Sequence, residues 1–369
     1  MALNESQDVV NLERPRGKMS FYQRILFPLL QRVDAERAHD LTIRALATAQ
    51  SGSAGRLLLQ TIAGTVPQRQ RRVFGLTFPN ELGVAAGYDK NGQAVLGLSM
   101  LGFGHIEVGT VTPWAQAGNP RPRIFRLPEE AALINRMGFP NHGMARVAAR
   151  LRQLKERRVS ARPFILGVSL GKQKETPLAE AAEDYVIVMR AVHAFADYLA
   201  INVSSPNTPG LRALQGRAYL EGLLERLQEE NLRLGADTSP RPILLKVAPD
   251  LTWAEIDVVL DAATRSGIDG LIATNTTVTR PGLAPGLGDE AGGLSGVPLA
   301  ERSLAVVSYI CGLVGDALPV IAVGGIRCAD DVRARLDVGA RLVQIYTALV
   351  FEGPRLPGRI LRRLEPRST

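Results

Sequence analysis

The chain has 369 residues, of which 46% are hydrophobic and 22% charged, a balance typical of a folded protein and not of a disordered one. Its 44 Lys and Arg against 36 Asp and Glu give a net charge of +8, but aromatic residues make up only 5% and no basic run interleaves with them, so the sequence predicts no nucleic-acid binding. Two cysteines exclude a disulfide framework and indicate a reducing compartment, and no segment predicts a membrane-spanning helix, a signal peptide or a transit peptide.

The N-terminal part of the chain, residues 1–62, is predicted to hold a polar leader over 1–18 and then two amphipathic helices. The first helix begins at Ser20, has an apolar residue at every fourth position from Phe21, and is bent or interrupted by Pro28. The second begins after Asp34, a residue type that caps helix N-termini, and ends in the Gly- and Ser-rich stretch 51–55. Its predicted inner face consists of Ala38, Leu41, Ala45 and Ala49. The helices either pack as an appendage or form a membrane-surface or ligand-gating hairpin, and the pattern leaves both open.

Residues 63–369 are predicted to form one α/β domain, in which short aliphatic runs alternate with helical stretches. Eight runs have the composition of buried strands: Leu82–Ala86, Ile106–Gly109, Phe164–Ser169, Tyr198–Val203, Ile243–Val247, Gly270–Thr274, Val320–Val323 and Leu342–Tyr346. Helices are predicted at Glu180–Phe195, Tyr219–Leu234, Thr252–Arg265 and Leu299–Leu313. Eight strand–helix units favour a (β/α)₈ TIM barrel with a small helical extension, and a doubly wound sheet is the alternative.

The last two predicted strands are followed by residues suited to a phosphate group. Gly324 and Gly325 follow the seventh strand, and Tyr346 and Thr347 follow the eighth. Glycines let backbone N–H groups approach an anion, and barrel enzymes often bind phosphate at this position. A Gly-Gly pair also forms ordinary tight turns, but its position after the seventh strand favours a phosphate site.

Amide and hydroxyl side chains gather near the ends of the other strands, where a barrel carries its chemistry. The set consists of Lys90, Asn135, Asn202, Ser205, Asn207, Asn275 and Thr276. No metal site is predicted, because the four histidines have no partners at ligand spacing. Neither a nucleophile–base pair nor paired carboxylates are evident. The set suits a planar, anionic heterocycle bound beside a phosphorylated cofactor.

Five motifs resemble, in order, those of the dihydroorotate dehydrogenase family: Ala86–Lys90, Gly109–Pro113, Asn135–Phe139, Asn202–Leu211 and Gly293–Gly296. The resemblance extends from about Ser20 to the C-terminus, and its Asn-x-Ser-Ser-Pro-Asn-Thr-Pro-Gly-Leu string is highly specific. The N-terminal helices, with the segment Asp34–His39, and serine in place of cysteine at Ser205 are similar to class 2, the quinone-dependent and membrane-associated enzymes.

The resemblance implies oxidation of (S)-dihydroorotate to orotate in pyrimidine (UMP) biosynthesis, with one FMN per chain as hydride acceptor and a membrane quinone as final acceptor. It implies FMN contacts at Ala86, Gly87, Lys90, Thr110, Ser169, Asn202, Lys246, Thr274, Gly296, Gly325, Tyr346 and Thr347. It implies contacts to dihydroorotate or orotate at Lys90, Asn135, Arg136, Met137, Gly138, Phe139, Asn202, Asn207, Asn275 and Thr276. The N-terminal helices would attach the protein peripherally to the cytoplasmic face of the cell inner membrane, with quinone access near His39 and Arg126.

Catalytic roles also follow from the resemblance. Ser205 would remove the C5 proton of dihydroorotate while C6 delivers hydride to flavin N5, and Thr208 stands at the family's relay position. Lys246 would place positive charge beside the flavin pyrimidine edge, and Lys90 would offset the substrate carboxylate.

The chain departs from the family at Ser169 and Gln173, where asparagine is usual. Serine is shorter than asparagine, and a water could bridge the flavin contact expected at Ser169. One alternative is a related FMN barrel dehydrogenase with a soluble acceptor, fumarate or NAD, but the N-terminal helices and Ser205 argue against it. A second is a lipid-binding or scaffold protein with a degenerate barrel. The intact set Lys90, Ser205, Asn207, Lys246 and Asn275 argues against that one.

Overall fold

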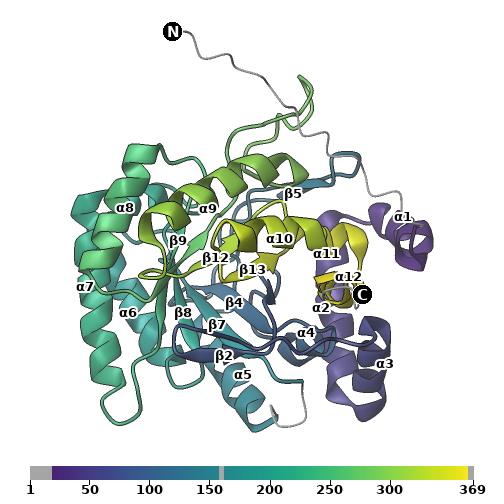
Figure 1. The fold of residues 1–369 in the computed structure, drawn as a ribbon, viewed down its shortest axis with the longest axis horizontal. Coiled ribbons are helices and arrows are strands. Elements are labelled where there is room, and N and C mark those ends of the chain that lie inside the picture. The colour runs from purple at the N-terminus through teal and green to yellow at the C-terminus, as the bar shows by residue number, and fades with distance from the viewer. Residues whose placement is uncertain (1–18, 158–161, 365–369) are drawn as a thin grey trace.

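The computed structural model describes residues 19–157 and 162–364, so the leader predicted at 1–18 lies outside the described residues. Eight parallel strands close into a barrel in the order β10-β12-β13-β3-β4-β7-β8-β9, which confirms the (β/α)₈ prediction over the doubly wound alternative (Figure 1). The strands are β3 (Leu82–Val84), β4 (His105–Val111), β7 (Ile165–Leu170), β8 (Tyr198–Asn202), β9 (Ile243–Val247), β10 (Gly270–Ala273), β12 (Val320–Val323) and β13 (Leu342–Ile345).

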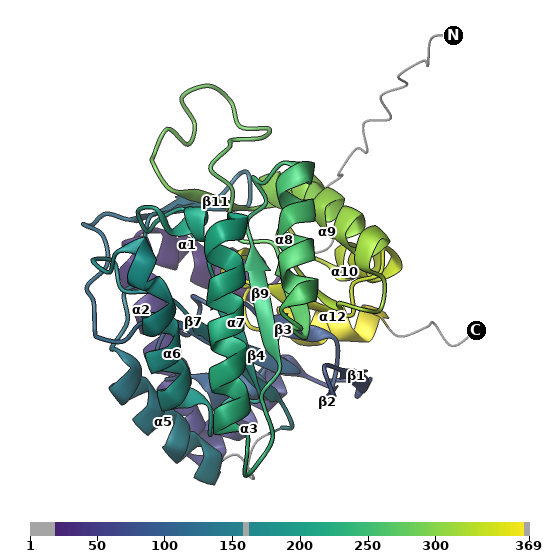
Figure 2. The ribbon, with the colours of Figure 1, turned by 90° about the vertical axis from the view of Figure 1, so that its left-hand side faces the viewer.

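Helices connect the strands and form the outer layer of the barrel (Figure 2). They are α4 (Val95–Met100), α5 (Met144–Arg157), α6 (Ala181–Val192), α7 (Arg217–Leu234), α8 (Trp253–Arg265), α9 (Ala300–Val314), α10 (Ala329–Asp337), α11 (Thr347–Glu352) and α12 (Leu356–Leu364), with 3₁₀ turns at η3 (Leu178–Glu180), η4 (Leu211–Gln215) and η5 (Val297–Leu299). The four helices predicted from apolar periodicity correspond to α6, α7, α8 and α9. At the start of α8, Thr252 and Glu255 form a capping box, which explains why the helix begins there.

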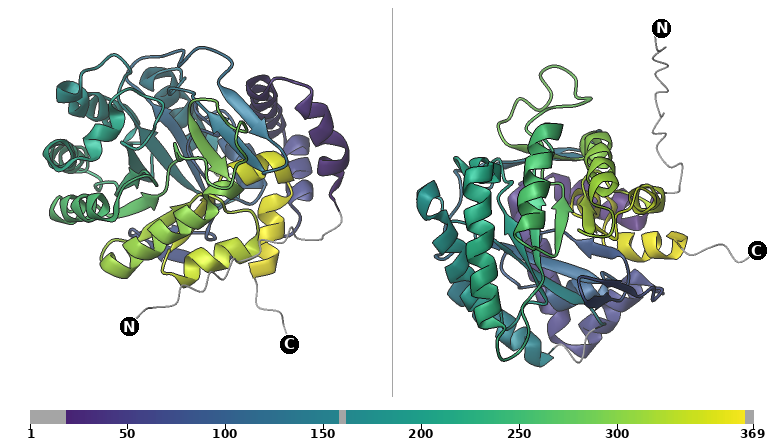
Figure 3. Two further views of the ribbon diagram at one scale, coloured as in Figure 1. Left: turned by 90° about the horizontal axis from the view of Figure 1, so that it is seen from above. Right: turned by 60° about the vertical axis from the view of Figure 1, so that its left-hand side comes forward.

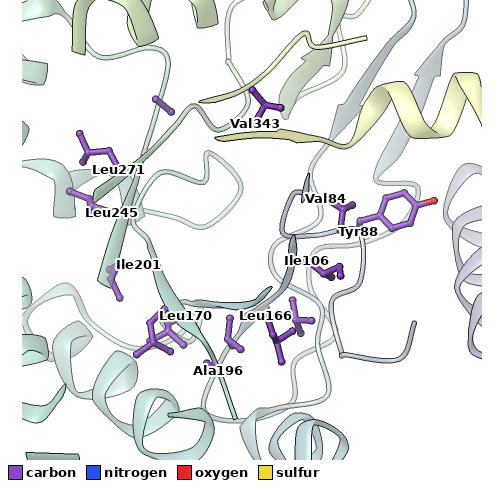
Figure 4. Packing of buried hydrophobic residues seen from close by; sticks show 14 of the residues in the cluster. Val84, Tyr88, Ile106, Leu166, Leu170, Ala196, Ile201, Leu245, Leu271 and Val343 are labelled. Atoms are coloured by element: carbon purple, nitrogen blue, oxygen red, sulfur yellow. The ribbon is translucent and has the colours of Figure 1, made fainter. Parts of the chain in front are cut away.

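The alternation of side chains along each strand divides the interior into two cores. Outward-facing residues such as Ile106, Leu166 and Leu245 pack beneath the helices (Figure 4). Inward-facing residues such as Tyr198 fill the amino-terminal half of the barrel, which the hairpin β1 (Arg71–Val73) and β2 (Leu76–Phe78) closes with the fully buried Phe78. The aliphatic runs of the sequence therefore supply both cores, and the carboxyl ends of the strands remain available for polar groups.

A second, smaller sheet covers the carboxyl ends of the barrel strands. It consists of the antiparallel strands β5 (Ile124–Leu127), β6 (Ala132–Asn135) and β11 (Gly293–Gly296) in the order β11-β6-β5. Two of these strands come from the connection between β4 and β7, and β11 comes from the connection between β10 and β12 (Figures 1 and 2). The register pairs Asn135 with Gly293, so two motifs that are far apart in the sequence meet in this sheet. This sheet was not predicted from the sequence.

The N-terminal extension contains one helix more than predicted and lies on one side of the barrel beside α11 and α12 (Figure 3). A π-helical turn η1 (Tyr22–Leu26) runs directly into α1 (Phe27–Gln31), and Pro28 lies in the first turn of α1. The cap predicted at Asp34 is confirmed, since its Oδ1 accepts from the backbone N–H of Arg37 at 3.0 Å at the start of α2 (Ala35–Ser51). The stretch 51–55 ends α2 but also begins α3 (Ser53–Ala63), which the prediction missed.

The inner face predicted for α2 is only partly correct. Ala38 is buried, but the side chain of Leu41 is 53% exposed, and Ile43 and Leu46 are buried in its place. The burial of α2 is set by α4 and α3, against which it packs, and helical periodicity alone could not identify these partners.

By length and composition alone, residues 297–314 could cross a membrane, although no membrane-spanning helix was predicted from the sequence. The segment comprises η5 and α9, and α9 packs on β10 and β12 with Val306, Val307 and Ile310 buried. An outer helix of a barrel meets the same compositional criterion, because one of its faces belongs to the core.

Candidate functional site

A cavity lies at the carboxyl ends of the barrel strands, beneath the sheet β11-β6-β5, and is called here the strand-end cavity. Every residue that the sequence assigns to the cofactor or the substrate lines this cavity, with the exceptions of Ser169 and Arg136. Ser205 and Lys246 also line it, whereas Thr208 does not. The fold thus brings motifs spread from Ala86 to Thr347 around one volume, as expected for the active face of a barrel.

Asn202 is the centre of a hydrogen-bonded cluster in this cavity. It ends β8 at an inward-facing position and is paired in register with Lys246 on β9. Its Nδ2 donates to Thr110 Oγ1 at 2.8 Å, and its Oδ1 accepts from Asn275 Nδ2 at 3.3 Å. Asn275 Nδ2 also donates to Ser204 Oγ at 3.0 Å. These bonds hold each amide in one orientation, which a site that matches the edges of a planar ligand requires.

Ser205 and Asn207 lie on the loop that follows β8. The Ser205 side chain faces the cavity although the residue is only 6% exposed, and its Oγ accepts from the backbone N–H of Asn207 at 3.3 Å. Asn207 Nδ2 donates to Asn135 Oδ1 at 3.0 Å, which ties this loop to β6 above it. Thr208 is buried, and its Oγ1 has no hydrogen-bond partner within the described residues. An unpaired buried hydroxyl is suited to bonding a water molecule or a ligand.

Lys90 connects the strand-end cavity to the N-terminal helices. Its Nζ lies 3.2 Å from Nε2 of His39 on α2. The loop that carries it is fixed by Asp89, whose buried carboxylate accepts from the backbone N–H of Ala94 at 2.7 Å. Loss of water around the ammonium lowers the pKa of Lys90 to about 8, although nearby carboxylates, Asp40 first among them, act in the opposite direction. The same loss of water, together with the Lys90 charge, holds the pKa of His39 well below its usual range.

Lys246 is paired with a glutamate inside the barrel. Its Nζ lies 3.3 Å from Oε1 of Glu107, a fully buried residue at an inward-facing position of β4. The other carboxylate oxygen of Glu107 accepts from Gln344 Nε2 at 2.9 Å and from the Tyr198 hydroxyl at 3.1 Å. Both glutamate oxygens therefore have partners, and Glu107 balances the charge of Lys246 inside the barrel. Lys246 also lines the strand-end cavity.

The turn after β12 has the backbone that a phosphate site needs. Gly324 and Gly325 have φ angles of +119° and +68°, and a Cβ on Gly325 would lie 2.3 Å from Ala300 Cα, so only glycine fits there. The carboxylate of Asp331 already accepts from the backbone N–H groups of Arg327 and Cys328 at the start of α10. The amides available to an anion are therefore those of the glycine turn and not those of α10 itself.

Two positions that the sequence assigned to ligands do not line the cavity. Ser169 is fully buried, and its Oγ lies 3.0 Å from Oγ1 of Thr110, which does line it. Ser169 therefore supports a cavity residue from behind. Arg136 turns outward, where its guanidinium pairs with Glu290 at 2.6 Å and lies 4.7 Å above the ring of Phe125.

A second cavity, of about 430 Å³, lies between the N-terminal helices and the barrel and is called here the helix cavity. Its lining is mostly apolar. One side comes from η1, α1, α2 and α3, including Ala38, Leu46 and Leu59, and the other side comes from barrel segments such as Leu101 and Leu349. It shares Ile124, Leu133 and Tyr346 with the strand-end cavity, so the two cavities meet.

The polar residues of the helix cavity include His39 and Arg126, the two that the sequence assigned to quinone access. His39 packs edge-on against Tyr88, which packs in turn against Tyr346. The Arg126 guanidinium donates to the backbone oxygens of Leu30, at 2.9 Å, and of Val33. Arg126 thus binds the C-terminal end of α1 and closes one side of the helix cavity.

Several residues of the site were missed by the sequence analysis. Gln344 lines the strand-end cavity from the middle of β13, and its Oε1 has no partner within the described residues. Arg327 and Ser295 also line it, and Ser295 Oγ lies 2.8 Å from Thr347 Oγ1. Arg327 could have been found, because it is a basic residue two positions after the glycine turn. Gln344 and Glu107 lie inside strands, where no local pattern marks them.

The strand-end cavity suits a large anionic ligand with a planar, hydrogen-bonding ring. It offers three cationic side chains, Lys90, Lys246 and Arg327, and the unpartnered buried atoms Gln344 Oε1 and Thr276 Oγ1. Buried polar atoms normally have partners, so a bound group is expected to supply them. Among residues 19–157 and 162–364, no group of three His, Cys, Asp or Glu side chains could hold a metal ion.

Comparison with known proteins relates this chain to one family. The family model for dihydroorotate dehydrogenase matches residues 69–367. The chain is 50% identical over 361 residues to a dihydroorotate dehydrogenase (quinone) of Chloroflexus aurantiacus, covering 95% of this chain and 97% of the relative. It is 47% identical over 344 residues to the protein of the same name from Methylococcus capsulatus, covering 92% and 98%.

The fold is also similar to that of a solved structure. The crystal structure of DHODH from Eimeria tenella in complex with ferulenol superposes with a TM-score of 0.81 at 37% sequence identity. The superposition covers 92% of this chain and 93% of the Eimeria chain.

Proposed function

Since the chain belongs to the dihydroorotate dehydrogenase family, it oxidises dihydroorotate to orotate with a quinone as acceptor, and we propose that the oxidation takes place in the strand-end cavity with one FMN per chain. The observation that carries this proposal is the convergence of Ser205, Lys90 and the asparagine cluster on one cavity, next to an apolar cavity formed by the N-terminal helices. The activity serves pyrimidine biosynthesis.

We propose that the strand-end cavity holds the two ligands side by side. The glycine turn at Gly324 and Gly325 would hold the FMN phosphate, with Arg327 beside it, and Lys246 and Thr110 would contact the ring system. Lys90 would attract the carboxylate of dihydroorotate, while four amides, those of Asn135, Asn202, Asn207 and Asn275, would match the ring edges. When bound, FMN would supply the hydride acceptor for the oxidation of dihydroorotate and the electrons that reduce quinone.

Ser205 would act as the base that removes the C5 proton. A free serine hydroxyl is a poor base, so it needs a group that takes up its own proton as the reaction proceeds. The buried Thr208 hydroxyl, which has no partner in the described part of the chain, would relay that proton through water. Asn207 would orient the serine, because its backbone N–H donates to Ser205 Oγ at 3.3 Å.

We propose that quinone binds in the helix cavity and that the N-terminal helices attach the protein peripherally to the cytoplasmic face of the cell inner membrane. Apolar side chains project from these helices into solvent: Phe21 is 65%, Leu29 53%, Leu57 64% and Leu58 57% exposed. An exposed apolar face of this kind favours insertion into a membrane interface. A tail of the quinone would lie between the helices, with its ring near Tyr346, where the two cavities meet.

A soluble acceptor, fumarate or NAD, is the alternative, but neither charged molecule suits the helix cavity, whose lining is mostly apolar. Steady-state assays of the FMN-loaded protein with dihydroorotate and quinone, fumarate or NAD in parallel test this choice. We expect turnover with quinone. Turnover with fumarate or NAD in place of quinone would overturn the proposed acceptor, and absence of flavin reduction by dihydroorotate would overturn the whole proposal.

Filling the helix cavity is expected to block quinone without affecting the pyrimidine reaction. Ala45 lines this cavity on an exposed part of α2, so Ala45→Phe adds a ring to the cavity without overpacking the core. Reoxidation by a long-tailed quinone should slow at least tenfold, because the added ring occupies space that the quinone would fill. A loss of about 1.4 kcal/mol of apolar binding free energy corresponds to that factor. Flavin reduction by dihydroorotate and reoxidation by a small soluble dye should be unchanged.

The matched control is Arg44→Phe, which adds the same ring one residue earlier, at an exposed position that does not line the cavity. It should leave quinone reoxidation near the wild-type rate. Equal losses in the two variants would show that an added ring on α2 acts through the membrane-facing surface and not through the cavity.

Orotate binding is expected to weaken as the pH rises through about 8, the pKa to which burial lowers Lys90. The protonated ammonium attracts the carboxylate of orotate, and it is the major form only below that pH. The dissociation constant should therefore be constant at lower pH and rise by about tenfold per pH unit above it. Titration of the FMN-loaded protein, followed by flavin absorbance, measures this constant. Lys90→Met should bind weakly at every pH, and a wild-type constant that does not change across pH 8 would contradict the assignment.

A further inference from the structure

The loop of residues 115–123, between β4 and β5, contacts both α2 and the segments that carry the substrate amides. None of its residues lines the strand-end cavity or the helix cavity. The loop is therefore outside the set of residues assigned to ligands, and its contacts are with the segments that surround the cavities.

The loop is anchored to α2 by a buried ion pair. Glu36 on α2 is 6% exposed, and its carboxylate accepts two hydrogen bonds from the Arg123 guanidinium, from Nη2 at 2.6 Å and from Nε at 2.9 Å. The remaining nitrogen, Nη1, donates to the backbone oxygens of Ala117 at 2.6 Å and Asn119 at 2.8 Å. Arg123 thus fixes the shape of the loop as well as its position, since a buried bidentate pair tolerates little displacement.

Asn119 lies in the middle of this loop and holds two substrate-site segments together. Its Nδ2 donates to the backbone oxygen of Arg136 at 3.0 Å and to that of Asn207 at 3.0 Å. Its backbone N–H donates to the oxygen of Met137 at 2.9 Å. A Cβ on Gly138 would lie 2.8 Å from the Asn119 side chain, so this side chain is in close contact with the backbone of Gly138.

We propose that Asn119 is a positioning residue for the dihydroorotate site and that the Glu36–Arg123 ion pair fixes it to α2. The helix that carries His39 toward the helix cavity would then also set the spacing between segments 135–139 and 205–207. This inference rests on the proposed function for the identity of the ligand. It extends that function by making α2 a structural part of the pyrimidine site as well as of the quinone site.

The test compares Asn119→Ala with wild type in two measurements on the FMN-loaded protein. Asn119 is half-buried and its side chain makes only these two donations in the described structure, so the variant is expected to fold. Loss of two hydrogen bonds that position the segments should weaken orotate binding by about tenfold, measured by flavin absorbance. FMN content should change little, because Asn119 does not line the strand-end cavity. Amide hydrogen exchange in residues 205–211 should become faster without any substrate present.

Arg123→Lys and Arg121→Lys form the matched pair that tests the anchor. Both arginines contact Glu36, but the Arg123 side chain is 5% exposed and that of Arg121 is 63% exposed. Lysine keeps the charge and loses the bidentate geometry, so the Arg123 variant should weaken orotate binding and the Arg121 variant should not. Unchanged orotate affinity and unchanged exchange in Asn119→Ala would overturn the inference. If wild type did not bind orotate, the proposed function would fail, while the exchange measurement would still decide the positioning role.

Discussion

Replacement of Ser205 by alanine is expected to slow flavin reduction by dihydroorotate by about 10²–10⁴-fold, the usual contribution of a positioned general base. FMN and orotate should still bind, because the Ser205 hydroxyl makes no hydrogen bond to the amides of Asn135, Asn202 or Asn275 in the structure. Stopped-flow absorbance of the flavin, after mixing with saturating dihydroorotate, measures the reduction step alone. This measurement also separates an effect on proton removal from an effect on reoxidation by quinone.

Ser205→Cys is the conservative comparison. A thiol titrates near pH 8.5, so this variant should recover part of the rate with a pH profile that rises toward that value. Near-wild-type reduction by the alanine variant at all pH values would remove Ser205 from the role of base. If the orotate affinity fell by the same factor as the reduction rate, Ser205 would be assigned to substrate binding.

Replacement of Lys246 by methionine is expected to have the largest effect on stability. The change leaves the carboxylate of Glu107 buried without its cation, at a position that is fully shielded from solvent. Removing one partner of a buried ion pair typically costs about 3–5 kcal/mol. Urea denaturation at saturating FMN should show this loss in the free energy of unfolding, and reduction by dihydroorotate should also be slow.

The double variant Glu107→Gln, Lys246→Met separates stability from chemistry. A neutral glutamine can still accept from Tyr198 and Gln344, so most of the lost free energy of unfolding should return. Flavin reduction should remain slow, since the Lys246 ammonium is still missing from the cavity. Recovery of the reduction rate along with stability would show that Lys246 serves only to balance Glu107.

The barrel could be predicted from sequence because each strand is a short aliphatic run that is buried on both faces, such as Ile243–Val247. The smaller sheet β11-β6-β5 could not be predicted, because β5 and β6 have half-exposed or mixed positions and β11 contains two glycines in four residues. The helix α3 was missed because Gly52 has two roles. It ends α2, as the sequence indicated, and the same residue, with an extended backbone, is the N-cap of α3.

The candidate site was predictable where its side chains follow strands. Asn202 and Lys246 stand at strand ends with a polar character that packing does not explain, and the structure brings both to the same cavity. Residues that act from a distance were not predictable. Glu36 and Arg123 are 87 positions apart, and no periodicity relates a charged helix residue to a loop in another part of the chain. Only the folded contacts reveal such a pair.

The boundary between the two cavities has a consequence for the order of events in turnover. The cavities share only Ile124, Leu133 and Tyr346 among their lining residues, so orotate and quinone would occupy separate volumes. Accumulated orotate would then compete with dihydroorotate but not with quinone, and a quinone could enter before the pyrimidine product has left. Reoxidation of the flavin by quinone would then not require an empty pyrimidine site, and orotate would slow turnover only by competing with dihydroorotate.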